Sequence, residues 1–173
     1  MQSHRHSPYR PHDAFDLAAL LRDLEGLDIR LDSAERDRAG ADYHWSSPVL
    51  LDRLLGKRPD AVLRPRDSAD VGLIAAACAR HRVPLTVRGG GTGNYGQCVP
   101  LFGGVSLDMT GLNRVLRVED GWASVQAGVL LHSLNLAARQ TGQQLRMWPS
   151  TERIATLGGF IAEIGRASCR ERV

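Results

Sequence analysis

The sequence predicts an α+β fold, in which a small βαβ unit is followed by an incomplete mixed or antiparallel sheet with helices. A short apolar run between two prolines precedes a helical pattern and a second apolar run, which gives strand, helix and strand in order. Beyond residue 100, short segments alternate apolar and polar residues, as half-buried strands do. We divide the 173 residues into a helical and irregular region (1–59), a main domain (60–163) and a tail (164–173).

The region 1–59 begins with a polar arm. Residues 1–12 are rich in His and Arg and lack the apolar core of a secretory signal, so we interpret them as a polar arm rather than a metal site. Apolar residues at helical spacing then predict a helix over 14–25, with Asp13 as its N-cap and Gly26 at its end.

The rest of this region is weakly patterned. Residues 28–43 are polar and charged and are predicted to form a surface segment, and residues 48–55 a short helix. Residues 42–45, Asp-Tyr-His-Trp, admit two interpretations: an arm packed near a bound cofactor, or a surface segment anchored by its aromatic side chains.

The βαβ unit opens the main domain. Residues 61–63 form the first predicted strand, and Asp67 caps a helix whose apolar residues recur at helical spacing up to residue 79. Pro84 ends that helix, and residues 85–87 form the second strand. Short links between these elements favour a right-handed parallel arrangement.

The remainder of the domain contains four predicted strands and one helix, and then the start of a further element. Asp120-Gly121 is a typical hairpin turn, and Gly142 ends the helix. The predicted strands are 105–109, 115–118, 122–127 and 144–147, the helix is 130–140, and the further element is 151–163.

A glycine-rich loop directly follows the strand 85–87. Its sequence, RGGGTGNYG from Arg88 to Gly96, supplies backbone that can take positive φ and successive N–H groups that can bind phosphate or pyrophosphate. By itself such a glycine-rich segment is equally typical of a tight turn that binds no ligand. Thr92 and Asn94 can add side-chain hydrogen bonds, and Arg88 either supplies charge or braces the loop. The loop lacks the Lys of a Walker motif and the following helix of a Rossmann motif.

A second set of small and hydroxylated residues lies at 149–151 (PST) and 156–162 (TLGGFIA). Two such segments in one small domain indicate two walls of a long cofactor cleft.

In order, the segments PLTVRGGGTGNYGQ, GGVSLDM, VQAGV, PST and ATLGGFIA make residues 60–163 similar to a known family. They resemble the PCMH-type FAD-binding domain of the vanillyl-alcohol oxidase/p-cresol methylhydroxylase family, which includes the flavin subunits of glycolate oxidase and D-lactate dehydrogenase. The resemblance implies that FAD is the cofactor. Some relatives attach it through a His where this chain has Thr92, so we predict non-covalent FAD. The cofactor-binding residues that the resemblance implies are Arg88, Gly89, Gly90, Gly91, Thr92, Gly93, Asn94, Gly96, Gln97, Pro149, Ser150, Thr151, Thr156, Gly158 and Gly159.

The same resemblance implies a flavin-dependent oxidoreductase, of which this chain is an N-terminal fragment. The intact enzyme is expected to oxidise a 2-hydroxy acid or related alcohol by hydride transfer to FAD, with an unidentified electron acceptor. No catalytic residue and no metal ligand is predicted. The alternatives are a non-catalytic nucleotide- or phosphate-binding module, and a fragment that does not fold stably.

Composition excludes other classes of protein. No basic stripe interleaved with aromatic residues indicates nucleic-acid binding, and no apolar run is long enough for a transmembrane segment, so we expect a cytoplasmic protein. The tail, IGRASCRERV, resembles a translated sequencing adapter, and we predict that it is not native. It carries three Arg and one Glu, so without it the formal charge falls from +3 to +1.

Overall fold

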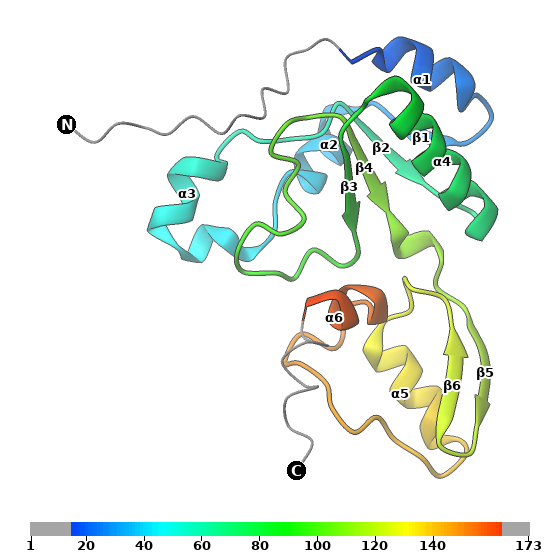
Figure 1. Ribbon diagram of the computed structural model, residues 1–173. Helices are drawn as coiled ribbons and strands as arrows, with labels where there is room; N and C mark the ends of the chain where they lie inside the picture. Colours follow the sequence, from blue (N-terminus) through cyan, green and yellow to red (C-terminus); the bar gives the residue numbers. More distant parts are fainter. Residues whose placement is uncertain (1–14, 164–173) are drawn as a thin grey trace.

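A four-stranded sheet organises the N-terminal half of the molecule (Figure 1). The computed structural model describes residues 15–163; the predicted polar arm, Asp13 and the predicted adapter-derived tail lie outside this range. Strands β2, β4 and β3 are parallel, and β1 joins β2 as an antiparallel edge strand. In spatial order the strands are β1 (Asp28–Arg30), β2 (Ala61–Arg64), β4 (Val105–Asp108) and β3 (Leu85–Arg88).

The predicted strands at 61–63, 85–87 and 105–109 are confirmed, with one addition to the topology. β4 lies between the two strands of the βαβ unit, so that unit is parallel but skips one position in the sheet. β4 is buried along its whole length, including Ser106 and Asp108, because neighbouring strands flank it and other elements cover both of its faces.

Two helices pack together over the apolar core beside this sheet. α1 (Leu17–Asp23) and α4 (Ser68–His81) contact each other and contribute the fully buried Leu20 and Ile74. Asp67 caps α4 as predicted, since its Oδ1 accepts a hydrogen bond from Asp70 N at 2.9 Å. α1 begins later than expected, because Asp16 is its N-cap.

Residues 28–43, predicted to be a surface segment, are mostly exposed or half-buried as expected, but they also form regular structure that the sequence did not predict. They form β1, helix α2 (Ser33–Ala39) and the start of the 3₁₀ helix η1 (Tyr43–Ser46). α2 has no apolar stripe; instead the Asp32 cap and ion pairs with the sheet stabilise it. The predicted short helix is confirmed as α3 (Pro48–Leu54).

The C-terminal half contains a hairpin and two helices. The hairpin and its turn at Gly121 are confirmed, as is the predicted helix that ends before Gly142. The first half carries a mixed sheet and the second half an antiparallel hairpin, each with helices, as in an α+β fold. The elements are β5 (Val115–Glu119), β6 (Trp122–Val125), α5 (Leu131–Arg139) and α6 (Leu157–Glu163), preceded by the 3₁₀ turn η2 (Met109–Gly111).

The predicted strand at 144–147 is wrong. This segment is irregular, and Leu145 N donates to Asn135 Oδ1 of α5 at 3.1 Å rather than to a neighbouring strand. The expected element at 151–163 is a turn that leads into α6. Among residues 15–163, no helix combines the length and the apolar character that a membrane crossing requires.

Candidate functional site

An open cleft of about 1010 Å³ is lined by residues of both halves of the molecule. The glycine-rich loop that follows β3 forms one side, and the segments 149–151 and 155–163 form the other. Val87, Met109 and Ala127 add apolar surface. Small-molecule sites usually measure ~300–1,000 Å³, so this cleft is large enough for a dinucleotide.

The structure brings nearly all of the predicted site residues together. All but two of them line this cleft; Arg88 and Gly96 do not. Those that line it are Gly89, Gly90, Gly91, Thr92, Gly93, Asn94, Gln97, Pro149, Ser150, Thr151, Thr156, Gly158 and Gly159.

The first glycines of the loop are required by protein packing. A Cβ atom at Gly89 would overlap Thr156 Oγ1, and one at Gly90 would overlap the backbone oxygen of Ile154. The loop and the segment 154–156 therefore approach each other as closely as two backbones can. This contact joins the two sides of the cleft at its base.

The amide groups of the loop are available to a ligand. None of the N–H groups from Gly89 to Asn94 donates a hydrogen bond to a partner within residues 15–163. Unpaired backbone donors are rare unless water or a ligand takes them. Successive free N–H groups on the wall of a cleft form an anion-binding nest.

Arg88 braces the loop from behind. Its Nη1 donates to Ala41 O at 2.7 Å, to Ala39 O at 3.3 Å and to Cys98 Sγ at 3.4 Å. Its guanidinium also lies against Gly91, where a Cβ would overlap it and where φ is +66°. Of the two roles open for Arg88, bracing is the one that these contacts show.

The end of the loop is tied to residues 42–44, the arm before α3. Asp42 Oδ2 accepts from Gly96 N at 2.9 Å, and Tyr43 N donates to Gly93 O at 2.8 Å. Asp42 Oδ1 also accepts from His44 Nδ1 at 2.7 Å, and both side chains are buried. The sequence left two interpretations of this arm, and these contacts favour packing near the cleft.

The opposite side of the cleft is shaped by turns and tight packing. Thr156 is fully buried, and its Oγ1 accepts from Gly159 N at 3.3 Å. Gly158 N donates to Ala127 O at 2.8 Å, and a Cβ at Gly158 would lie 2.9 Å from that oxygen. Trp148 is 42% exposed and does not line the cleft.

Two titratable residues in the cleft were missed by sequence reasoning. Burial raises the pKa of the Cys98 thiol, although the nearby Arg88 opposes this. Burial, followed by the negative charge of Asp42, raises the pKa of Glu163, whose Oε2 accepts from Gln97 Nε2 at 3.2 Å. No sequence pattern marks these residues, because their proximity depends on the fold. Within residues 15–163 no group of His, Cys, Asp or Glu is arranged to hold a metal ion.

Comparison with known proteins supports a cofactor cleft. Residues 59–173 match the family described as "FAD binding domain". The chain is 43% identical over 109 residues to D-2-hydroxyglutarate dehydrogenase of Escherichia coli, which covers 60% of this chain and 10% of that protein. It is 36% identical over 107 residues to glycolate oxidase subunit GlcD of Bacillus subtilis, covering 61% of this chain and 23% of that protein.

Solved structures share the fold. 4-Ethylphenol oxidase from Gulosibacter chungangensis superposes with a TM-score of 0.70 at 25% identity, over 87% of this chain and 30% of that one. p-Cresol methylhydroxylase superposes with a TM-score of 0.67 at 15% identity, over 83% and 28%. The predicted PCMH-type fold is therefore confirmed. The chain spans 10% and 23% of the length of the two relatives named above.

Proposed function

The chain belongs to the FAD binding domain family, and from this premise we propose that its cleft holds the FAD pyrophosphate against the amides of Gly89 to Asn94. The observation that carries the proposal is the row of free N–H groups on the cleft wall. They match the phosphate oxygens of a dinucleotide, which accept hydrogen bonds and carry negative charge. The volume of about 1010 Å³ accommodates the remainder of the cofactor.

The residues of this chain bind and orient the cofactor. When bound, FAD supplies a hydride acceptor at flavin N5. The loop fixes the phosphates, while residues 149–151 and Thr156, Gly158 and Gly159 lie along the opposite side of the cofactor. Thr92 takes part through its backbone amide, and the cofactor is held without a covalent bond.

The proposed reaction of the intact protein is the oxidation of a 2-hydroxy acid. The relatives support this substrate class by their names, D-2-hydroxyglutarate dehydrogenase and glycolate oxidase. Bound FAD would supply the hydride acceptor for the carbon that bears the hydroxyl group, and with loss of the hydroxyl proton to a base the 2-hydroxy acid would become a 2-oxo acid. An electron acceptor of the intact protein would take up the two electrons. We propose that this activity is cytoplasmic, and an assay of the activity in separated cell fractions tests this.

Titration of the 173-residue chain with FAD tests the binding step. We expect saturable quenching of flavin fluorescence and a shifted visible spectrum, with ADP competing for the same site. Equal binding of unrelated nucleotides, with no preference for FAD, would support the nucleotide-binding module instead. Absence of any binding by a folded chain would contradict both.

We propose that the source DNA encodes a longer frame with other sequence in place of residues 164–173, and expression of that frame tests the reaction. The product should carry flavin that is bleached under anaerobic conditions by a 2-hydroxy acid. Glycolate, D-lactate and D-2-hydroxyglutarate are the first compounds to test, with L-lactate and L-2-hydroxyglutarate as controls. A flavin that none of these reduces would overturn the proposed substrate class and leave FAD binding intact.

A further inference from the structure

Arg88 is a buried cation without a carboxylate partner in the described chain. Only 6% of the residue is exposed, and its hydrogen bonds go to two backbone carbonyls and the Cys98 thiol. Its Nε is buried and has no hydrogen-bond partner among residues 15–163. No carboxylate within residues 15–163 lies at ion-pair distance from the guanidinium. Since a guanidinium stays protonated in proteins, its charge is not compensated locally.

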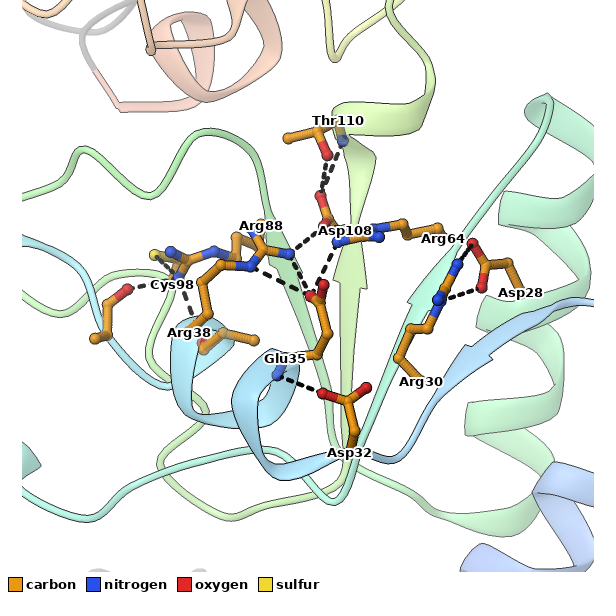
Figure 2. A network of polar contacts seen from close by, with 12 residues as sticks. Asp28, Arg30, Asp32, Glu35, Arg38, Arg64, Arg88, Cys98, Asp108 and Thr110 are labelled. Carbon is orange, nitrogen blue, oxygen red and sulfur yellow. Dashed lines mark hydrogen bonds and ion pairs between the residues drawn. The ribbon is translucent and has the colours of Figure 1, made fainter.

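The charges beside Arg88 at the ends of the parallel strands pair with one another and not with Arg88. Arg64, Asp108 and Arg88 end the parallel strands β2, β4 and β3, and Glu35 and Arg38 reach them from α2 (Figure 2). The Asp108 carboxylate pairs with Arg64 at 3.0 Å and with Arg38 at 3.1 Å. Glu35 pairs with the same two arginines, at 2.9 and 2.6 Å. Two arginines thus balance two carboxylates at the ends of the strands. The other buried carboxylate near the loop, Asp42, accepts from Gly96 N and His44 Nδ1 and forms no ion pair with Arg88.

This charge lies directly behind the donors that face the cleft. The guanidinium is in contact with the Cα side of Gly91, in the middle of the free amides. The opposite end of the loop has a different character, because Asp42 takes the Gly96 amide and Gln97 takes the Tyr95 amide. Within the described chain, the amides left for an anion are therefore those of Gly89 to Asn94.

We propose that Arg88 strengthens the binding of the FAD phosphates through its charge, acting from behind the loop without touching the ligand. Arg88 positions the loop through its hydrogen bonds to Ala39 O and Ala41 O. The electric field of its charge adds to that of the free amides. The buried charge that costs stability in the free chain is compensated when the anion binds. The inference rests on the proposed placement of the pyrophosphate.

A set of three variants of the 173-residue chain separates charge from bracing. Arg88→Gln removes the charge and keeps an amide donor of similar reach; Arg88→Lys keeps the charge. Arg53→Gln, on α3 outside the cleft, is the matched control for net charge. The readouts are the dissociation constant for FAD at several salt concentrations, and circular dichroism melts to confirm folding.

We expect Arg88→Gln to weaken FAD binding about tenfold at low salt, with a smaller effect at high salt because screening removes the field. Arg88→Lys should stay within about threefold of the unmodified chain, and Arg53→Gln should not differ from it. Equal, salt-independent losses in both folded Arg88 variants would overturn the proposal and leave bracing as the only role. If Arg88→Gln does not fold, the Arg88→Lys variant decides by itself. A folded Arg88→Lys variant that binds FAD more than about tenfold more weakly than the unmodified chain would overturn the proposal. If the unmodified chain binds no FAD, it is the proposed function that fails.

Discussion

At the scale of single residues, Asp108 shows how a buried charge is stabilised in this fold. Its side chain is 1% exposed and accepts hydrogen bonds from Arg64, Arg38 and Thr110. Burial by itself raises the pKa of this carboxyl, but the bonds from Thr110, Arg64 and Arg38 outweigh it and hold the pKa below its ordinary value. Asp108 thus joins α2 to the sheet as an anion.

The first prediction concerns Asp108→Asn. Removing one partner of a buried ion pair costs about 3–5 kcal/mol, so the variant should be less stable by that amount at pH 7. Because the folded pKa is lowered, the contribution of the carboxylate is complete above the unfolded pKa of about 3.9 and is lost as the pH falls through the folded value. In urea unfolding at neutral and acid pH, the free energies of unfolding of Asp108→Asn and of the unmodified chain should converge below about pH 4.

Asp28→Asn is the control for that measurement. Asp28 pairs with Arg30 on the exposed edge strand β1, so its removal should change stability by less than about 1 kcal/mol. A stability difference for Asp108→Asn that stays constant from neutral to acid pH would show that the ionised form is not what stabilises the fold.

The second prediction concerns Thr92. It lines the cleft, and an alcohol hydroxyl is a weak nucleophile at neutral pH, so FAD should stay unattached. Acid precipitation of the FAD-loaded chain should leave the flavin in the supernatant, and a denaturing gel of the chain should show no flavin fluorescence. A covalent flavoprotein run beside it controls for recovery. Fluorescence that migrates with the chain would mean that another cleft residue forms the bond.

At the scale of elements, two glycines differ in whether the fold has room for a side chain at their position. Gly90 lies in the loop, where a Cβ would overlap Ile154 O, a backbone atom that cannot rotate away. Gly72 lies on the exposed face of α4, where a Cβ would meet nothing within 4 Å. The same substitution should therefore have opposite effects at the two positions.

The third prediction compares Gly90→Ala with Gly72→Ala. Overpacking at Gly90 should destabilise the chain by about 1–3 kcal/mol and weaken FAD binding, because the loop must move away from residues 154–156. Gly72→Ala should stabilise it by about 0.5–1 kcal/mol through helix propensity and leave FAD binding unchanged. Denaturant unfolding and flavin titration measure both. A neutral Gly90→Ala would argue against the close contact between the two sides of the cleft.

Elements were predictable where local sequence stabilises them. The Asp67 cap and an apolar repeat predicted α4, and Gly121 predicted the hairpin. α2 was missed because its stabilising contacts are ion pairs with Arg64 and Asp108, far away in sequence. The order of the strands could not be predicted for a related reason, because the neighbours of each strand depend on contacts across the whole sheet.

At the scale of the whole molecule, the site was likewise predictable where local motifs mark it and not where contacts distant in sequence form it. The two glycine-rich segments were visible as motifs, and the structure brings them to one cleft. The arm at residues 42–44 was not assigned to it, because the bond from Gly96 N to Asp42 crosses 54 positions of the chain. Arg88 was ambiguous, since a sequence cannot show whether a side chain points to the ligand or behind it.

The fourth prediction is that FAD couples the two halves. The cleft is lined from both, so a ligand in it should stabilise both together, by about 2.7 kcal/mol at a free concentration one hundred times the dissociation constant. Trp45 lies in the first half and Trp122 in the second, and both side chains are more than half exposed. Fluorine NMR of the fluorotryptophan-labelled chain can follow each during heating, without interference from flavin fluorescence. FAD should raise both transitions and bring them to one temperature, because unfolding of either half destroys the site. A shift at one tryptophan alone would place the ligand within a single half, and a broad transition that FAD leaves unchanged would favour a chain that does not fold stably.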